Sequence, residues 1–287
     1  MKFIVLFLIA TVSVFSQDFI PNSEQFQTYV IDKMRDNKVK RVDITTYETD
    51  AYFKPLSDKA KYVYSYDYDR NGMLVLADYY NISQDIRVET SYAYTEGGTL
   101  ESIVSIQTEY GSSGNPFVTT TTWWATITDG RIEYITKYVS SGSDNNANST
   151  VPNKYIFTYD ANGTLLTILD SSTDPQSGVP NTLYEMNVRG DVLTKSSDNQ
   201  VTNYFYDNRG NVFQEIMDIN GSRYVTTYDY DMDGNLLSIG VDGSTDSFYW
   251  SAQNDAIGLP VNAYSTFTSK TDKSKIYEWN TYTYTFY

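Results

Sequence analysis

A short pattern recurs along most of this chain: aromatic residues at every second position, then an acidic or Asn-Gly turn, then an aliphatic run. One clear copy begins at Tyr155 and reads Tyr-Ile-Phe-Thr-Tyr-Asp-Ala-Asn-Gly-Thr-Leu-Leu, and further copies begin at Tyr204 and Tyr224. A repeated supersecondary unit largely fixes the architecture, because each unit buries its apolar face against its neighbours. The sequence therefore predicts an all-β repeat protein.

Glycines punctuate the repeat where hairpin turns are expected. Asn-Gly and Asp-Gly steps after an aromatic-rich run are strong hairpin signals, since type I′ turns need positive φ. The expected turn glycines are Gly72, Gly98, Gly130, Gly163, Gly190, Gly210, Gly234 and Gly258. Eight hairpins give about sixteen antiparallel strands, which we expect to form one continuous twisted strip over residues 61–287.

The N-terminal part differs from the repeat. Residues 1–16 contain one cation and an apolar run, which predicts a secretory signal peptide. Residues 17–60 are expected to form a capping unit. Within it, apolar spacings of three and four predict one helix over residues 23–37, and the alternation from Val39 predicts a strand.

Composition limits the chemistry that the chain can perform. Cysteine and histidine are both absent, which excludes thiolate and imidazole catalysis and the metal sites that these side chains build. The formal net charge is −15, so nucleic acid is not an expected partner. Outside the signal peptide, no run approaches the roughly twenty apolar residues of a membrane helix. A secreted protein without a cofactor is the simplest interpretation.

The chain resembles the YD-repeat family, which is named for a Tyr-Asp pair followed by a glycine and an aliphatic residue. Tyr159-Asp160 before Gly163 and Tyr206-Asp207 before Gly210 fit this pattern. In that family, which includes rearrangement-hotspot toxins and teneurins, hairpins join into a strip that spirals into a hollow shell. The resemblance implies an extracellular structural or contact role. Eight units are too few to enclose a cargo domain.

Two acidic turns have the spacing of calcium-binding loops. The calcium candidates are Asp67, Asp69, Asn71 and Asp78 in the first turn, and Asp229, Asp231 and Asp233 in the second. Calcium needs several oxygens converging on a tight turn. The flanking segments are strands rather than helices, however, and Asp and Asn are favoured in hairpin turns anyway.

Aromatic residues offer a second kind of site. The aromatic stripe includes Tyr79, Tyr80, Trp123, Trp124, Tyr249, Trp250 and Trp279. Aromatic rings can stack against sugars, and we name Trp123, Trp124, Tyr249 and Trp250 as candidate binding residues. The alternative is that these rings pack inward as core.

Two further chemistries have weaker support. Asn81, Asn148, Asn162 and Asn220 lie in glycosylation sequons. A carboxylate glycosidase needs only two carboxylates facing one sugar, but nothing distinguishes such a pair from the acidic turns. We therefore expect no enzyme.

The tail, Tyr277 to Tyr287, alternates as an aromatic strand. Outer-membrane barrels often end in this way, but charged strand positions oppose contact with lipid. An open strip has two unpaired edges, so the tail could pair with a neighbouring molecule near its N-terminal helix and give filaments. The expected function is a secreted structural or contact protein, with binding of a glycan or protein as the alternative.

Overall fold

The computed structural model describes residues 33–110, 116–142, 148–149, 153–172, 182–189, 191–197, 199–243 and 246–287. Its first ten strands are β1 (Val39–Thr49), β2 (Tyr62–Tyr68), β3 (Leu74–Asn81), β4 (Ile86–Tyr94), β5 (Leu100–Tyr110), β6 (Pro116–Thr128), β7 (Arg131–Gly142), β8 (Asn148–Ser149), β9 (Asn153–Tyr159) and β10 (Leu165–Ser172). The others are β11 (Thr182–Met186), β12 (Val192–Ser197), β13 (Gln200–Tyr206), β14 (Val212–Ile219), β15 (Ser222–Tyr230), β16 (Leu236–Asp242), β17 (Asp246–Asn254), β18 (Pro260–Ser269) and β19 (Lys275–Phe286).

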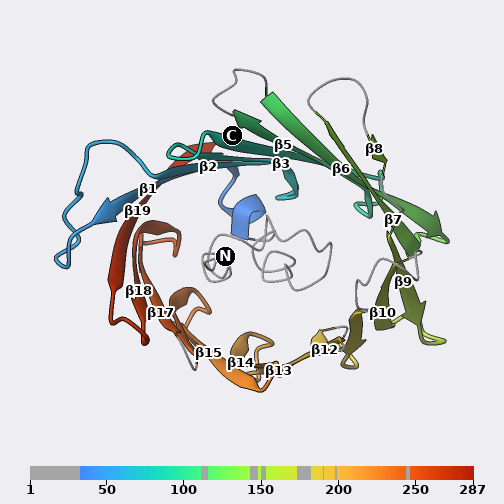
Figure 1. Cartoon of the computed structure of the whole chain (residues 1–287). Helices are drawn as coiled ribbons and strands as arrows, with labels where there is room; N and C mark the ends of the chain where they lie inside the picture. The colour runs from blue at the N-terminus through green and yellow to red at the C-terminus, as the bar shows by residue number, and fades with distance from the viewer. Residues whose placement is uncertain are drawn as a thin grey trace.

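The strands form a closed antiparallel barrel (Figure 1). Neighbours in the chain pair with each other, except that β7 pairs with β9 and the two-residue β8 adds only to β7. The ring closes because β1 pairs with β19, from Val39 opposite Phe286 to Thr49 opposite Tyr277. It contains 18 strands, an even number as antiparallel closure requires.

The predicted open strip of about eight hairpins is therefore wrong. The strand expected from Val39 and the expected tail strand both exist, but they pair with each other as β1 and β19. This pairing satisfies the backbone groups that an open strip would expose at its two edges. The edge that we expected to recruit a neighbouring molecule is thus occupied within the same chain.

Little of the predicted N-terminal helix lies among the described residues. Residues 33–36 form a helical turn, whereas the rest of the expected helix and the expected signal peptide lie outside the description. Within the described ranges, no helix combines the length and apolar character needed to cross a membrane.

The turn glycines are confirmed at seven of the expected positions. Positive φ occurs at Gly72, Gly98, Gly130, Gly163, Gly210, Gly234 and Gly258, and Gly190 lies outside the described residues. The expected turn type is mostly wrong. A type I′ turn has positive φ at both central residues, as at Asp129 and Gly130, where φ is 52° and 75°. At the other six positions the glycine alone is left-handed and follows a type I turn, a common hairpin geometry.

The aspartate that opens most of these turns accepts hydrogen bonds within its own turn. In the first turn, Asp69 Oδ1 accepts hydrogen bonds from the backbone N–H groups of Asn71 and Met73, both at 2.9 Å. Asp160, Asp207, Asp231 and Asp255 accept the equivalent pairs. An Asx side chain that satisfies two turn N–H groups is a local folding signal, and this explains why an acidic residue recurs at this position.

The preceding tyrosine connects neighbouring hairpins. Tyr94 Oη donates to the Leu74 carbonyl at 2.9 Å, and Tyr206 Oη donates to the Val192 carbonyl at 2.7 Å. Tyr159, Tyr230 and Tyr284 make the same bond to the residue two positions after the previous turn glycine. The tyrosine hydroxyls therefore tie successive repeats together along the rim formed by the glycine turns.

Side chains alternate between the lumen and the outside. Met34, on the helical turn inside the ring (Figure 1), packs in one cluster with Val42, Ile44, Tyr64 and Tyr66. Since successive side chains of a strand point to opposite faces, this contact identifies the inward face of every strand through the registers. The three buried clusters lie on that face, so the core lines the lumen.

Polar contacts at the opposite rim reinforce closure. Lys61, before β2, forms an ion pair with the buried Glu278 of β19, with Nζ 2.8 Å from Oε1. Nearby, Thr46 of β1 donates from Oγ1 to Oδ1 of Asn280 at 2.6 Å, and both residues are buried. Buried polar groups need such partners, so these contacts specify the join between β1, β2 and β19.

We predict that Tyr94→Phe lowers the free energy of unfolding by about 1 kcal/mol, because it deletes the hydroxyl bond to Leu74 and leaves the carbonyl unpaired. Urea unfolding of the purified protein measures this change. Tyr249→Phe is the matched control, since its ring is exposed on the outer face. Equal losses in the two variants would contradict a role for the hydroxyl tie.

We predict that Lys61→Met lowers the free energy of unfolding by about 3 kcal/mol, because the carboxylate of Glu278 loses its cation inside the wall. Adding Glu278→Leu recovers most of this loss, since an apolar pair needs no charge compensation. Urea unfolding of the single and double variants provides the test. A double variant as unstable as Lys61→Met would rule out the ion pair as the cause.

Candidate functional site: an aromatic face outside the barrel

The four predicted binding aromatics divide between the two faces of the barrel wall. Trp123 and Trp250 point inward and are 6% and 5% exposed. Trp123 packs with Ile103, and Trp250 belongs to another buried cluster. Their neighbours Trp124 and Tyr249 point outward and are 51% and 53% exposed. Adjacent residues cannot share a face of a strand, so half of the predicted set is core.

The two outward aromatics are also far apart. Trp124 lies on β6, whereas Tyr249 lies on β17, on the other side of the ring (Figure 1). The predicted residues therefore do not form one site. Of the two, only Tyr249 belongs to the larger aromatic surface on β17, β18, β19 and β1.

The centre of that surface is a row of three rings. Trp279 of β19 lies opposite Tyr264 of β18 and opposite Tyr47 of β1. The rings of Tyr47 and Trp279 are stacked, with centroids 5.6 Å apart and planes at 29°. Because neighbouring strands are about 4.8 Å apart, the row extends roughly 10 Å across the sheet. We call these three residues the aromatic row.

Neutral polar side chains lie beside the aromatic row. Asn262 accepts a hydrogen bond from Trp279 Nε1 at its Oδ1, at 3.1 Å, and donates from Nδ2 to Gln253 Oε1 at 3.3 Å. Thr281 and Thr45 continue the same level across β19 and β1. The face therefore offers apolar rings next to uncharged donors and acceptors.

A loop between β1 and β2 covers the other side of the row. The ring of Phe53 lies 4.9 Å from that of Tyr264 and 5.9 Å from that of Tyr277, centroid to centroid. Tyr52 and Leu56 on the same loop are exposed. The aromatic row, Phe53 and Tyr277 together make an aromatic face with one raised side.

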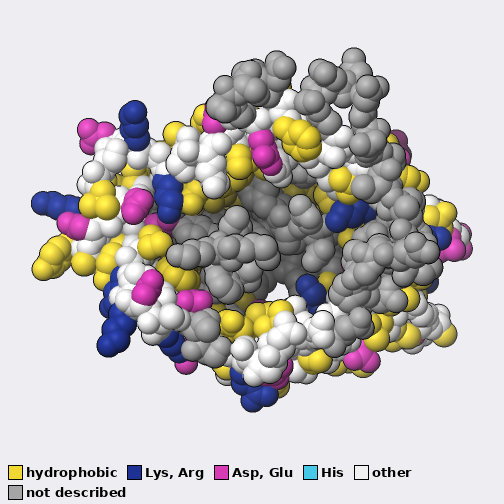
Figure 2. Space-filling view, in the orientation of Figure 1, with side chains coloured by type: hydrophobic (Ala, Val, Ile, Leu, Met, Phe, Trp, Pro, Cys, Tyr) yellow, Lys and Arg dark blue, Asp and Glu magenta, His cyan; other side chains and the backbone are white. Residues whose placement is uncertain are grey.

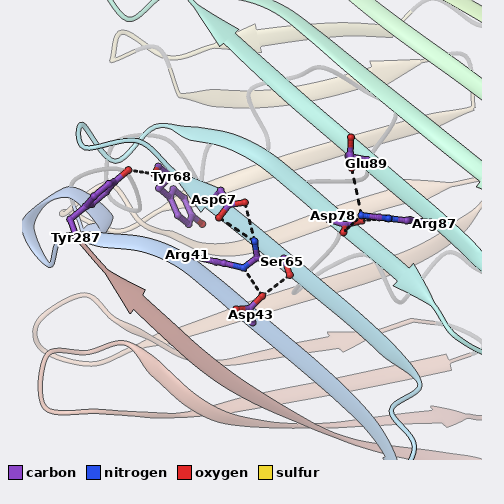
Figure 3. Close-up of polar contacts among 9 residues, drawn as sticks. All are labelled: Arg41, Asp43, Ser65, Asp67, Tyr68, Asp78, Arg87, Glu89 and Tyr287. Atoms are coloured by element: carbon purple, nitrogen blue, oxygen red, sulfur yellow. Dashed lines mark hydrogen bonds and ion pairs between the residues drawn. The ribbon is translucent and has the colours of Figure 1, made fainter.

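The outer surface of β1 to β4 is different, because it carries ion pairs (Figure 3). Arg41 lies between Asp43, at 2.8 Å, and Asp67, at 3.3 Å. Arg87 contacts Asp78 at 2.8 Å. In the view along the ring, charged side chains lie mainly around its outer margin (Figure 2).

These contacts account for the first calcium candidate. Asp67 and Asp78 pair with arginines on the outer surface, and Asp69 accepts the N–H groups of its turn. Asn71 donates its side-chain amide to Asp69 Oδ2. The side-chain oxygens of this candidate therefore take part in the turn and in the ion pairs instead of converging on one point.

The second calcium candidate is arranged in the same way. Asp229 accepts a hydrogen bond from Ser238 at 2.7 Å, and Asp231 accepts the N–H groups of Asp233 and Asn235. Beside this turn, Lys33 Nζ donates to Asn235 Oδ1 at 2.6 Å. Among the described residues, no group of three or more Asp and Glu side chains is placed to hold a metal ion.

The sequon asparagines differ in accessibility. Asn81 is buried and its amide bonds to Gln84, whereas Asn162 and Asn220 are exposed in turns. Asn148 lies in β8, and its side chain is outside the description. A glycan could therefore be attached at Asn162 or Asn220 without unfolding the wall.

Sequence reasoning included Trp279 but missed its partners in the aromatic face. Tyr47 and Tyr264 lie far from each other in the sequence and meet only through the registers of β19. Phe53 did leave a signal: Asp50 precedes it at the spacing that separates Asp69 from Gly72. A search that required glycine at the fourth turn position could not find it.

Comparisons with known proteins give no family. No family model matches the chain, and no curated protein matches it. A porin-like protein from Bacteroides uniformis is similar in structure, with a TM-score of 0.42 and 11% identity over 87% of this chain and 97% of that one.

Two toxin structures are also similar. TcdB2-TccC3-TEV has a TM-score of 0.30 and 16% identity over 79% of this chain, and the Photorhabdus luminescens Tc holotoxin pore has 0.26 and 11% over 81%. This chain spans 15% of the length of each of those chains. Likenesses this weak assign neither family nor function, and membership of the YD-repeat family stays a prediction.

We predict that an Asp160→Asn variant loses less stability in acid than the natural chain. Hydrogen bonds from the backbone N–H groups of Thr164, Asn162 and Gly163 hold the pKa of Asp160 below its usual value. Because the folded pKa is lowered, this contribution is complete above the unfolded aspartate pKa of about 3.9 and disappears as the pH falls through the lower folded value.

Asn retains the acceptor oxygen, as the natural Asn187 shows by accepting N–H bonds from Arg189 and Asp191. Urea midpoints at about pH 6 and about pH 3 measure the effect, since this interval contains the unfolded pKa. An identical pH dependence in both proteins would contradict the assignment.

Proposed function

We propose that this chain is an exported, non-enzymatic binding protein that holds a carbohydrate on the aromatic face outside its barrel. The observation that carries the proposal is the register that aligns Tyr264, Trp279 and Tyr47 beside the amides of Asn262 and Gln253. Sugars have apolar ring faces and hydroxyl edges, so flat aromatic rings next to neutral hydrogen-bonding groups suit them.

The distribution of exposed rings supports the outer face over the lumen. The inward tyrosines and tryptophans are mostly buried in the three clusters, so they already have packing partners. The aromatic row lies on the outer face, and Tyr249 beside it is half exposed. A ligand can reach this surface without rearrangement of the core.

Charged groups support an outer wall in contact with water. Arg41, Asp43, Arg87 and Asp78 lie on the outer faces of β1 to β4. Asp43 and Asp78 lie inside β1 and β3 and not at their ends, and a charge that faces lipid away from the interfaces is unfavourable. Together with the signal peptide predicted at residues 1–16, this favours a protein exposed at the cell surface or released from the cell.

Strand-edge assembly into filaments has lost its structural premise, because β1 and β19 pair with each other. A structural role for the barrel would need a contact between outer faces. The aromatic face is the surface with the chemistry for a partner, which is why binding is the function proposed here.

We predict that Trp279→Ala weakens carbohydrate binding about tenfold, the equivalent of about 1.4 kcal/mol. The experiment is affinity electrophoresis of the purified barrel through gels that contain a soluble glucan, mannan, xylan or galactan. Trp124→Ala is the matched control, because it removes an outward indole, itself 51% exposed, from the other side of the barrel. Equal weakening by both variants, or retardation by no polysaccharide, would refute the proposed site.

A further inference from the structure

The loop after β1, at the opposite rim, contains a further copy of the turn that opens with Asp69. Asp50 N donates to the Lys54 carbonyl at 2.9 Å, and Phe53 N donates to the Asp50 carbonyl at 3.0 Å. Asp50 Oδ1 also accepts the N–H groups of Tyr52 and Lys54, at 2.8 and 3.0 Å. Asp69 makes the same four bonds in the turn that ends at Gly72 and Met73.

Phe53 occupies the glycine position of this turn. Its φ is 57°, in the left-handed region that Gly72 and its equivalents occupy in the rim turns. A bulky side chain is disfavoured there, since its Cβ crowds the backbone. Backbone strain of this kind persists where the surroundings enforce it, and it gathers at functional sites.

The strained conformation places the Phe53 ring at a specific point of the outer wall. The ring plane is tilted by 59° from that of Tyr264 and by 89° from that of Tyr277. It therefore stands at an angle to the wall aromatics beside it instead of lying parallel to them. Tyr52, the preceding residue, is 88% exposed, so a large part of the loop's aromatic surface has no packing role.

The charges of this region restrict the ligand. The aromatic row, its amide neighbours and the loop aromatics carry no ionisable acid or base that is charged at neutral pH. The nearest charged side chains are on the loop: Asp50, whose Oδ1 accepts the N–H groups of Tyr52 and Lys54, and the exposed Lys54, which follows Phe53. The row itself offers a charged ligand no counter-charge, whereas a neutral sugar needs none.

We infer that Phe53 and Tyr52 form the specificity wall of the carbohydrate site, and that the ligand is a neutral polysaccharide chain lying along the aromatic row, across the strands. This inference rests on the proposed function. The row supplies stacking for one ring face, and the wall contacts an edge of the same chain and restricts which linkages fit. Asn262 and Gln253 provide the hydrogen bonds on the opposite side.

The test compares Phe53→Gly and Tyr52→Ala with the natural chain, using the neutral polysaccharide that binds best in the electrophoresis panel and an anionic control, polygalacturonate. Phe53→Gly restores the glycine of the other turns. We expect its Tm to stay within about 3 °C, since relief of the left-handed strain offsets lost ring contacts. We expect binding to weaken about tenfold, and Tyr52→Ala to weaken binding with no change in Tm.

Unchanged binding in both variants would refute the role of Phe53 and Tyr52 as a specificity wall. A large fall in the Tm of Phe53→Gly, together with normal binding by Tyr52→Ala, would also refute it, because Phe53 would then be a packing residue. Equal binding of polygalacturonate would overturn the neutral ligand class. Trp279→Ala separates the two proposals. If it abolishes binding while both loop variants bind normally, only the wall is refuted; if it also binds normally, the carbohydrate face itself is refuted.

Discussion

The pairing of β1 with β19 is the constraint on which the rest of this structure depends. It joins segments more than 200 residues apart, and it runs from Val39 opposite Phe286 to Thr49 opposite Tyr277. Closure gives every strand of the ring two neighbours, so no edge needs protection. It also creates the aromatic row, because Tyr47 and Trp279 face each other only through this register. The same pairing therefore determines both the fold and the candidate site.

Strand alternation then separates two uses of aromatic residues. Inward rings such as Tyr64 and Trp250 make the core. Each buries a large apolar area, but its hydroxyl or indole N–H group then needs a hydrogen-bond partner. Outward rings include the aromatic row, whose strands β1 and β19 also take part in ion pairs at other positions. A tyrosine-rich composition is thus mainly a consequence of building a barrel wall from hairpins. Only the rings at positions of opposite parity face outward.

The sequence contains the local part of this fold but not its closure. Turn positions such as Gly72 and Gly234 are predictable because Asx residues and glycine carry the turn chemistry within five residues. The type I geometry was missed because Asn-Gly also suits type I′ turns. Closure could not be predicted, since β1 and the tail are ordinary alternating strands whose complementarity has no local sign. Alternation along a strand separates Trp123 from Trp124, which is why only two of the four predicted binding aromatics face outward. Only long-range registers place Tyr264 beside Trp279.

The tyrosine hydroxyl bonds between neighbouring hairpins, here called tyrosine ties, lie at one end of the barrel among the described residues. The two ends are therefore expected to differ in how easily their strands open locally. At the glycine-turn end, tyrosine hydroxyl bonds hold hairpins to their neighbours. The opposite end has no such series among the described residues. Away from the contacts of Lys61 and Thr46, we expect amide protons at that end to exchange with solvent sooner than those beside the tyrosine ties.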